Sequence, residues 1–289
     1  MLKGGTHNYH NTILHGEYRN KTRNKLWDVL LKGEFYLSGL NSGDYQAYAT
    51  LGRYINPKFG WIKIFFKNVN RSPSYNFSSN SNFNFNNPGI TKKENIISFG
   101  AEANNALLNL GFRNHIITNL AYYTDYYHTA QSSKVVNLLQ VYASKKISLT
   151  KRWKWYVEAV VQQTDGSAPV KVPLFFTRNR LAYEGVFFKN LNLSAGIEAR
   201  YYTPYEAYNY SPVMGSFVPQ DSVKIKNLPD ISAFLHFRIK SFTAFIRAEN
   251  LNTVSFKNGF GFTHNNFAAP HYPTQGLMVR FGIQWGFVN

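Results

Sequence analysis

Apolar and polar residues alternate along most of the chain with a period of two, which places them on opposite faces of a β-strand. Residues 191–200 show this well, because Leu193, Ala195 and Ile197 alternate with polar or charged neighbours. The period recurs often enough to predict thirteen strands, and no segment shows a convincing amphipathic helix. The predicted strands are 10–19, 26–38, 45–55, 61–70, 93–103, 107–123, 135–147, 153–164, 173–188, 191–203, 230–240, 242–252 and 276–288.

Many of these strands are 10–13 residues long, whereas strands of soluble proteins have about 5–6 residues and tilted membrane strands about 9–11. The connections alternate between short and long, as the periplasmic turns and outer loops of an outer-membrane barrel do. The long ones are 72–92, 124–134, 204–229 and 252–275. The pattern predicts an all-β fold, an antiparallel transmembrane outer-membrane β-barrel with about 13 visible strands, as a single domain over residues 1–289.

The five tryptophans support the membrane interpretation. Trp27, Trp61 and Trp153 begin strands beside short connections, Trp155 follows closely, and Trp285 lies near the end of the last strand. Indole rings favour the membrane interface, because one edge is apolar and the N–H needs a polar partner. A soluble β-sandwich, the alternative fold, has no reason to gather tryptophan at one end of its strands.

The composition raises other functions and weakens them. The net charge of +17 and the aromatic content of 17% are also typical of nucleic-acid-binding proteins. The 32 Lys and Arg residues are spread along the strands rather than gathered in one patch or tail, so we expect no nucleic acid partner. Cysteine is absent, and the sequence contains no HExxH, nucleophile elbow or phosphate-binding loop. We expect neither an enzyme nor a cofactor or metal, although a catalytic group assembled from distant strands stays open as an alternative.

Alternation places a set of charged residues on the polar face of the strands. An Arg or Lys that faced lipid at mid-membrane would cost about 2–4 kcal/mol, so we predict that this face lines the lumen. A ladder of structural ion pairs is an equally good interpretation of any one of them. The predicted pore-lining residues are Lys32, Lys63, Lys67, Arg178, Arg180, Arg200, Arg238, Arg247, Arg280, Glu34, Glu158, Glu184, Glu198 and Glu249.

Nine cations against five carboxylates in this set predict a weak preference for anions, because a narrow lumen with low-dielectric walls focuses the field of its charges. Arg238, Arg247 and Arg280 lie on the last three predicted strands and would form one basic stripe if their registers align.

The end of the chain resembles the C-terminal signal that the outer-membrane assembly machinery recognises. Arg280, Gly282, Trp285 and Phe287 occupy its positions, with the small difference that two residues follow the final aromatic. An aromatic strand edge is suited to capture by strand addition before a barrel closes.

About the last 170 residues also resemble the putative porin family of Bacteroidetes outer membranes. The matching landmarks are 172–176 (VPLFF), 196–207 (GIEARYYTPYEA), 210–212 (YSP), 249–250 (EN) and 270–273 (PHYP), followed by the terminal strand. The resemblance implies a barrel in the cell outer membrane, and it implies no particular solute. Members of this family are usually longer and begin with a signal peptide.

The leading functional hypothesis is a porin-like channel for the passive diffusion of small polar solutes. The alternative is a barrel that docks a protein or polysaccharide partner through its long outer loops. The expected partners are outer-membrane lipid, the barrel-assembly machinery and small polar solutes, with a homo-oligomer left open. Single-chain bacterial barrels have even strand numbers, so the odd number here leads us to expect further strands and a signal peptide before this chain.

Overall fold

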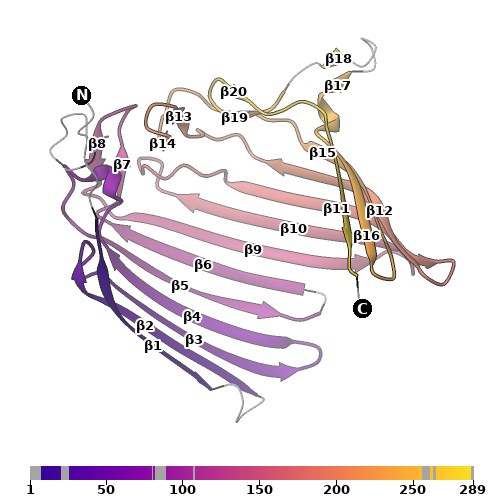
Figure 1. The fold of residues 1–289 in the computed structure, drawn as a ribbon, viewed down its shortest axis with the longest axis horizontal. Coiled ribbons are helices and arrows are strands. Elements are labelled where there is room, and N and C mark those ends of the chain that lie inside the picture. Colours follow the sequence, from indigo (N-terminus) through magenta and orange to yellow (C-terminus); the bar gives the residue numbers. More distant parts are fainter. Residues whose placement is uncertain are drawn as a thin grey trace. The chain divides into compact units, whose positions relative to one another are not determined.

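The computed structural model describes residues 8–20, 26–79, 81, 89–106, 108–255, 261–262 and 265–287. Thirteen long strands form one sheet in which neighbours follow the order of the chain (Figure 1). Every pair of these strands whose register is described is antiparallel. They are β1 (Asn11–Asn20), β2 (Trp27–Gly39), β3 (Tyr45–Asn56), β4 (Gly60–Arg71), β5 (Glu94–Asn104), β6 (Leu108–Thr118), β9 (Val136–Ser148), β10 (Trp153–Thr164), β11 (Phe175–Phe187), β12 (Leu191–Tyr202), β15 (Asp230–Ile239), β16 (Phe242–Glu249) and β21 (Met278–Trp285). The predicted antiparallel all-β fold with thirteen strands is confirmed.

The long connections contain small hairpins of their own. These are β7 (Ala121–Tyr123) with β8 (Thr129–Gln131), β13 (Asn209–Ser211) with β14 (Ser216–Val218), β17 (Val254–Ser255) with β18 (Gly261–Phe262), and β19 (Phe267–Ala269) with β20 (Tyr272–Pro273). Helical structure in the described ranges is confined to two single turns, η1 (Tyr75–Phe77) and η2 (Leu251–Thr253). No helix in that part of the chain is long and apolar enough to cross a membrane.

In two places an asparagine in the left-handed conformation ends a strand earlier than the alternation predicts. The predicted strand 107–123 is divided at Asn119, whose φ is 55°, and β7 begins as a separate strand beyond it. The predicted strand 242–252 ends at Glu249, because Asn250 has a φ of 59° and starts η2. Asparagine tolerates this conformation better than most residues with a side chain, so it ends a strand where hydrophobic alternation continues.

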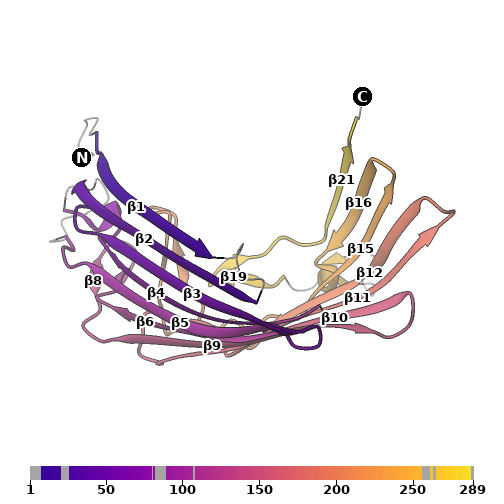
Figure 2. The ribbon, with the colours of Figure 1, turned by 90° about the horizontal axis from the view of Figure 1, so that it is seen from below.

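The chain forms two compact units. The first comprises Met1–Val141, Gln162–Val172 and Ala207–Ser222, and the second comprises Tyr142–Val161, Pro173–Glu206 and Val223–Asn289. The first unit therefore holds β1 to β6, which lie side by side in Figures 1 and 2. The second unit holds β11, β12, β15, β16 and β21.

In both units apolar side chains of one face of the sheet are exposed, while some polar neighbours on the other face are buried. Ile197 is 56% exposed, whereas its neighbour Glu198 is 2% exposed. In the first unit Leu51 is 40% exposed and Thr50 only 6%. In water-soluble proteins apolar side chains are mostly buried and charged side chains are mostly exposed. The arrangement here is the reverse. An exposed apolar face of this extent suits contact with lipid.

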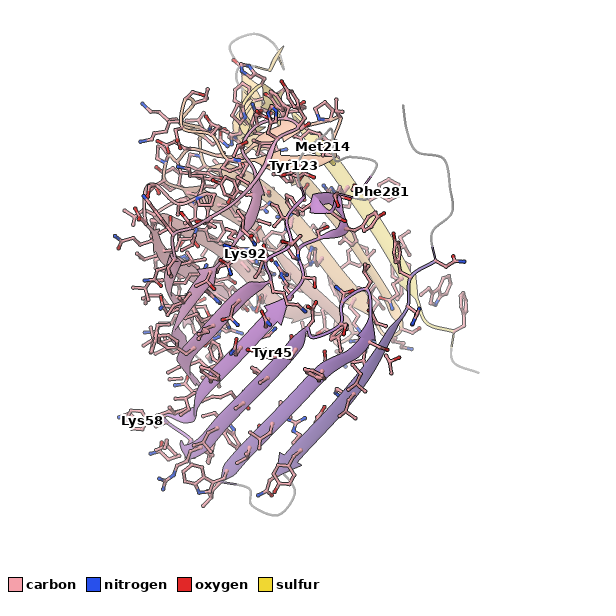
Figure 3. All side chains as sticks on the ribbon, turned by 90° about the vertical axis from the view of Figure 1, so that its left-hand side faces the viewer. Tyr45, Lys58, Lys92, Tyr123, Met214 and Phe281 are labelled. Carbon is pink, nitrogen blue, oxygen red and sulfur yellow. The ribbon has the colours of Figure 1, made fainter. Side chains whose placement is uncertain are left out.

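The tryptophans lie at the ends of the strands that carry short turns. Trp61 follows the turn between β3 and β4 and packs on Tyr54, with ring centroids 5.7 Å apart. In the second unit Trp153 packs edge-on against Tyr183 at 5.3 Å, and Trp285 against Phe242 at 5.9 Å. In Figure 3 Lys58 marks the short turn of the β3–β4 hairpin, and Tyr45 marks the opposite end of β3.

The long connections of the first unit meet in a small apolar core. Tyr123 from β7, with Met214 and Val218 from the β13–β14 hairpin, are at most 5% exposed, and Phe77 of η1 packs against them. Tyr123 and Met214 are labelled in Figure 3. The Phe77 and Tyr123 rings lie 4.8 Å apart. The alternation of short and long connections predicts that these three connections are outer loops on the same side of the membrane. In the structure they pack against one another.

Candidate functional site

Strand register places all fourteen predicted pore-lining residues opposite the exposed apolar side chains of their own unit. Lys32, Glu34, Lys63 and Lys67 share the polar face of the first unit. The other ten share the polar face of the second unit: Arg178, Arg180, Arg200, Arg238, Arg247, Arg280, Glu158, Glu184, Glu198 and Glu249.

Glu198 is the centre of the charge network in the second unit. Its side chain is 2% exposed and accepts hydrogen bonds from Arg178 Nη2 at 2.7 Å and from Arg247 Nη2 at 2.7 Å. The Nε atom of Arg200 lies 3.6 Å from Glu198 Oε1. Three guanidinium groups thus surround one carboxylate, and each hydrogen bond to a charged group is stronger than a neutral one.

The network continues towards the last strand through Glu249. Arg247 and Arg280 lie directly opposite each other on β16 and β21, so their charges repel. Glu249 lies between them, with Oε1 at 3.0 Å from Arg247 Nε and Oε2 at 3.0 Å from Arg280 Nη2. The carboxylate therefore holds the two cations on one face of the hairpin.

Arg180 is held without a carboxylate partner within 4.0 Å among the described residues. Its guanidinium lies 4.4 Å from the centre of the Phe234 ring and 5.4 Å from that of Tyr156. Its Nη2 donates to Ser194 Oγ at 3.2 Å, while its Nε is buried and has no hydrogen-bond partner. Its positive charge is therefore stabilised by aromatic faces and is not neutralised.

The registers do not form the single basic stripe considered from the sequence. Arg247 and Arg280 are opposite each other, but Arg238 pairs with Thr243, next to the β15–β16 turn. Because β15 and β16 are joined by Lys240 and Ser241, Arg238 lies close to that turn, whereas Arg247 lies farther along β16. The Nε of Arg238 donates to the carbonyl oxygen of Lys240 at 3.0 Å.

The first unit carries ion pairs that the sequence analysis did not assign to the site. Lys32 pairs with Glu17 at 2.9 Å, and Glu102 lies 4.0 Å from Lys63 and 3.9 Å from Arg113. Extending the same alternation across β5 and β6 would have found Glu102 and Arg113, because both lie on the polar face.

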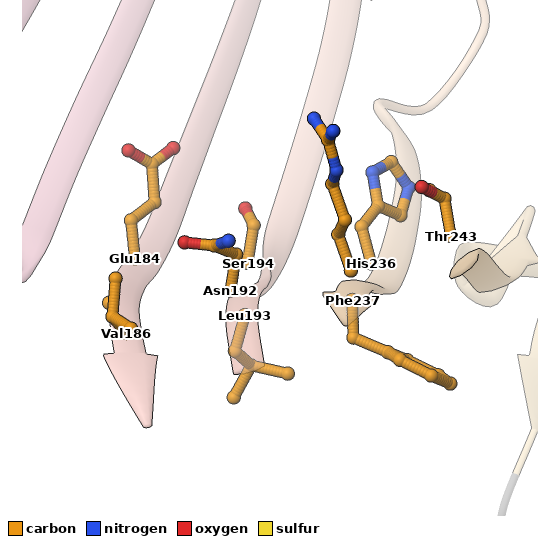
Figure 4. Close-up of a pocket in the computed structure, with 10 residues that line it drawn as sticks. Glu184, Val186, Asn192, Leu193, Ser194, His236, Phe237 and Thr243 are labelled. Atoms are coloured by element: carbon orange, nitrogen blue, oxygen red, sulfur yellow. The ribbon is translucent and has the colours of Figure 1, made fainter. Parts of the chain in front are cut away.

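Along the polar faces, the described residues line three cavities. One of about 440 Å³ in the second unit has Asn192 and Ser194 between Glu184 on one side and His236 on the other (Figure 4), and Arg238 also lines it. The Tyr156 hydroxyl donates to Glu184 Oε1 at 2.8 Å. In the first unit a cavity of about 280 Å³ adjoins Lys63 and Glu102, and one of about 460 Å³ adjoins Glu34 and Lys67.

Hydrogen bonds to Asp44 join two connections at the edge of the largest of these cavities. We call the group of Asp44, Ser72 and Lys93 the Asp44 clasp. Asp44 accepts hydrogen bonds from Ser72 N at 2.8 Å, Ser72 Oγ at 2.9 Å and Lys93 Nζ at 2.6 Å. Burial raises the pKa of the Asp44 carboxyl, but the bonds from Lys93 and Ser72 outweigh this effect and hold the pKa below its ordinary value. The carboxylate is therefore charged at neutral pH and ties the starts of β3 and β5 to the end of β4.

The residues of the predicted assembly signal occupy both faces of β21. Trp285 and Phe287 are 60% and 80% exposed, and their rings stack with centroids 4.9 Å apart. Gly282 lies on the polar face opposite Phe245, where an added Cβ would lie 2.3 Å from Phe245 Cε1. A side chain at position 282 would therefore force the Phe245 ring to shift.

No group of three or more His, Asp or Glu side chains with the arrangement of a metal site occurs in the described ranges.

The family described as putative porin matches residues 3–289. The chain belongs to this porin family. Membership of the porin family, together with a fold shared with outer-membrane barrels, places this porin in the cell outer membrane. No curated protein matches it.

Solved outer-membrane barrels share the fold of this porin. The copper transporter OprC matches with a TM-score of 0.67 and 13% identity, over 96% of the porin and 48% of that chain. The siderophore receptor PirA from Acinetobacter baumannii matches with a TM-score of 0.61 and 9% identity, over 96% and 46%. The FpvAI–pyocin S2 complex matches with a TM-score of 0.62 and 12% identity, over 96% and 39%. This porin spans less than half the length of each of these chains.

Proposed function

We propose that this porin lets small polar solutes diffuse passively across the outer membrane, with a weak preference for anions and without catalysing a reaction. The observation that carries the proposal is that, in the part of the chain that the structure describes, the polar face of the second unit holds cations without a carboxylate partner, of which Arg180 is the more buried example. Arg180 has no carboxylate within 4.0 Å among the described residues, while Glu198 and Glu249 are already shared among four arginines.

The charge arrangement supports a preference that is weak. A cation and an anion 4 Å apart attract by about 1 kcal/mol in bulk water and by about 4 kcal/mol at an effective dielectric constant of 20. Even the smaller figure exceeds RT and biases a permeating ion. Most arginines of the network are paired, which limits the field that a passing anion meets.

The test is a recording from the purified full chain in a planar bilayer under a potassium chloride gradient. Steady open conductance with a reversal potential displaced towards that of chloride supports the proposal. A non-conducting protein, or one that selects potassium, contradicts it. Higher salt screens the charges, so the displacement should shrink as the ionic strength rises.

A second candidate function is the docking of a protein or polysaccharide through the long connections. The packed cluster of Phe77, Tyr123, Met214 and Val218 favours it, because ordered loops present a defined surface. One barrel of similar fold is recorded in complex with the protein pyocin S2. A closed channel that retains a loop-dependent binding partner would favour docking over diffusion.

The proposed partners are outer-membrane lipid at the exposed apolar face and the assembly machinery at β21. A single-domain barrel stays a prediction, and a homo-oligomer stays open.

A further inference from the structure

The cavity of about 460 Å³ in the first unit has a fixed rim. Asp44 ties the β2–β3 connection to Ser72 and Lys93, and Lys93 Nζ also donates to the carbonyl oxygen of Ser42 at 2.6 Å. Asn41 exchanges two hydrogen bonds with Asn11 of β1, at 3.0 and 2.9 Å. The mouth of the cavity is therefore ordered before any solute enters, which lowers the entropic cost of binding.

Several charges around this cavity are already paired. Asp44 pairs with Lys93, and Arg71 pairs with Glu94 through a 2.8 Å contact. Glu34 and Lys67 differ from them. Both line the cavity and are partly buried, and neither forms an ion pair or a hydrogen bond with another described side chain.

Strand register explains why Glu34 and Lys67 do not neutralise each other. Glu34 lies on β2 opposite Gln46 of β3, and Gln46 lies opposite Val69 of β4, two residues beyond Lys67. One whole strand and a shift of two residues thus separate them, and their charged atoms are more than 4.0 Å apart. His15, which lies opposite Glu34 on β1, makes no ion pair with it in the described structure.

We propose that this cavity binds a small zwitterion, such as an amino acid, with its ammonium group at Glu34 and its carboxylate at Lys67. A solute that carries both charges on one short skeleton satisfies two unpaired groups of opposite sign at once. A singly charged or neutral solute leaves one of them desolvated and unpaired, which weakens its binding. The inference rests on the proposed diffusion function, since it names one class of solute that the channel would carry.

Binding is measured by isothermal titration of the full chain in detergent with L-alanine. N-acetyl-L-alanine and L-alanine methyl ester serve as probes that keep only the negative or only the positive charge. We expect saturable binding of L-alanine and at least tenfold weaker binding of both probes. Equal binding of L-alanine and either probe, or no saturable binding, overturns the proposal without requiring any variant.

The variants Glu34→Gln and Lys67→Gln should each weaken L-alanine binding at least tenfold. Lys63→Gln is the matched control, because Lys63 lies on the same face of β4 but adjoins a different cavity. Unchanged affinity in Glu34→Gln and Lys67→Gln, or an equal loss in Lys63→Gln, overturns the proposal. Bilayer conductance separates the two proposals. Conductance without L-alanine binding would contradict the proposed binding site but not passive diffusion. L-alanine binding without conductance would contradict passive diffusion but not the binding site.

Discussion

Arg247 on β16 hydrogen-bonds to Glu198 on β12 at 2.7 Å, although β15 lies between their two strands. On β15 the residue opposite Glu198 is Ser232, a small residue that is 1% exposed, and the residue opposite Arg247 is Phe234. The short serine leaves room for the guanidinium to pass over β15. Together with the hydrogen bond from Arg178, the bond from Arg247 links β11, β12 and β16 through the carboxylate of Glu198.

Replacing Glu198 by Gln should destabilise the protein by about 3–5 kcal/mol, the usual effect of removing one partner from a buried ion pair. The change removes the buried carboxylate that Arg178 and Arg247 share, and leaves them only the more distant contact with Glu158 and the contact with Glu249. Chemical unfolding in detergent micelles measures the loss. Glu158→Gln is the control, because Glu158 is half exposed and 3.8 Å from Arg178, so its loss should be about 1 kcal/mol or less.

Ser232→Leu should also destabilise the protein, because a larger side chain fills the path of the Arg247 guanidinium over β15. Overpacking of this kind costs about 1–3 kcal/mol. The double variant with Arg247→Ala is informative, since part of the Ser232→Leu effect should vanish once the guanidinium is gone. Additive losses in the double variant would show that the two positions are independent.

Gly282→Ala should lower stability by about 1–3 kcal/mol through overpacking, since the new Cβ would lie 2.3 Å from Phe245 Cε1. Phe245→Ala should restore most of this loss when combined with Gly282→Ala. Unfolding experiments on the two single variants and the double variant measure the coupling. If Gly282 matters only as part of an assembly signal, Phe245→Ala will not rescue it.

Arg180→Gln combined with Arg238→Gln should move the reversal potential towards that of potassium. Neither arginine has a carboxylate within 4.0 Å in the described structure, so their removal lowers the net positive charge without breaking an ion pair. Bilayer recordings under a potassium chloride gradient measure the change. Lys58→Gln is the control, because Lys58 lies in the short turn between β3 and β4 and should leave the reversal potential unchanged. An unchanged reversal potential in the double variant argues against these arginines as selectivity groups.

The Asp44 clasp should make stability depend on acid pH. Its pKa is lowered in the folded protein, so its contribution is fully present above the unfolded-state pKa of about 3.9 and is lost as the pH falls through the lower folded value. The unfolding free energies of the wild type and Asp44→Asn should therefore differ at pH 7 and converge at the acid end. A difference that is constant over this range would contradict the clasp.

The strands and their faces were predictable from alternation, because a period of two requires no knowledge of distant partners. The same alternation assigned Glu198 and Ile197 to opposite faces, and the exposed fractions of 2% and 56% agree with that assignment. Prediction failed where backbone conformation competes with hydrophobicity, as at Asn119 and Asn250. A single asparagine in the left-handed region ended each strand there.

The sequence alone determined the all-β fold, the two-faced strands and the charged residues of the polar face, because these depend on local periodicity. Tertiary structure decided which charges are paired, because pairing depends on register between strands that are far apart in the chain. Register placed Arg247 within reach of Glu198, moved Arg238 away from Arg280, and left Glu34 and Lys67 separated by a strand. A shift of two residues in any one of these pairings would preserve both faces and change the contacts made across that pairing.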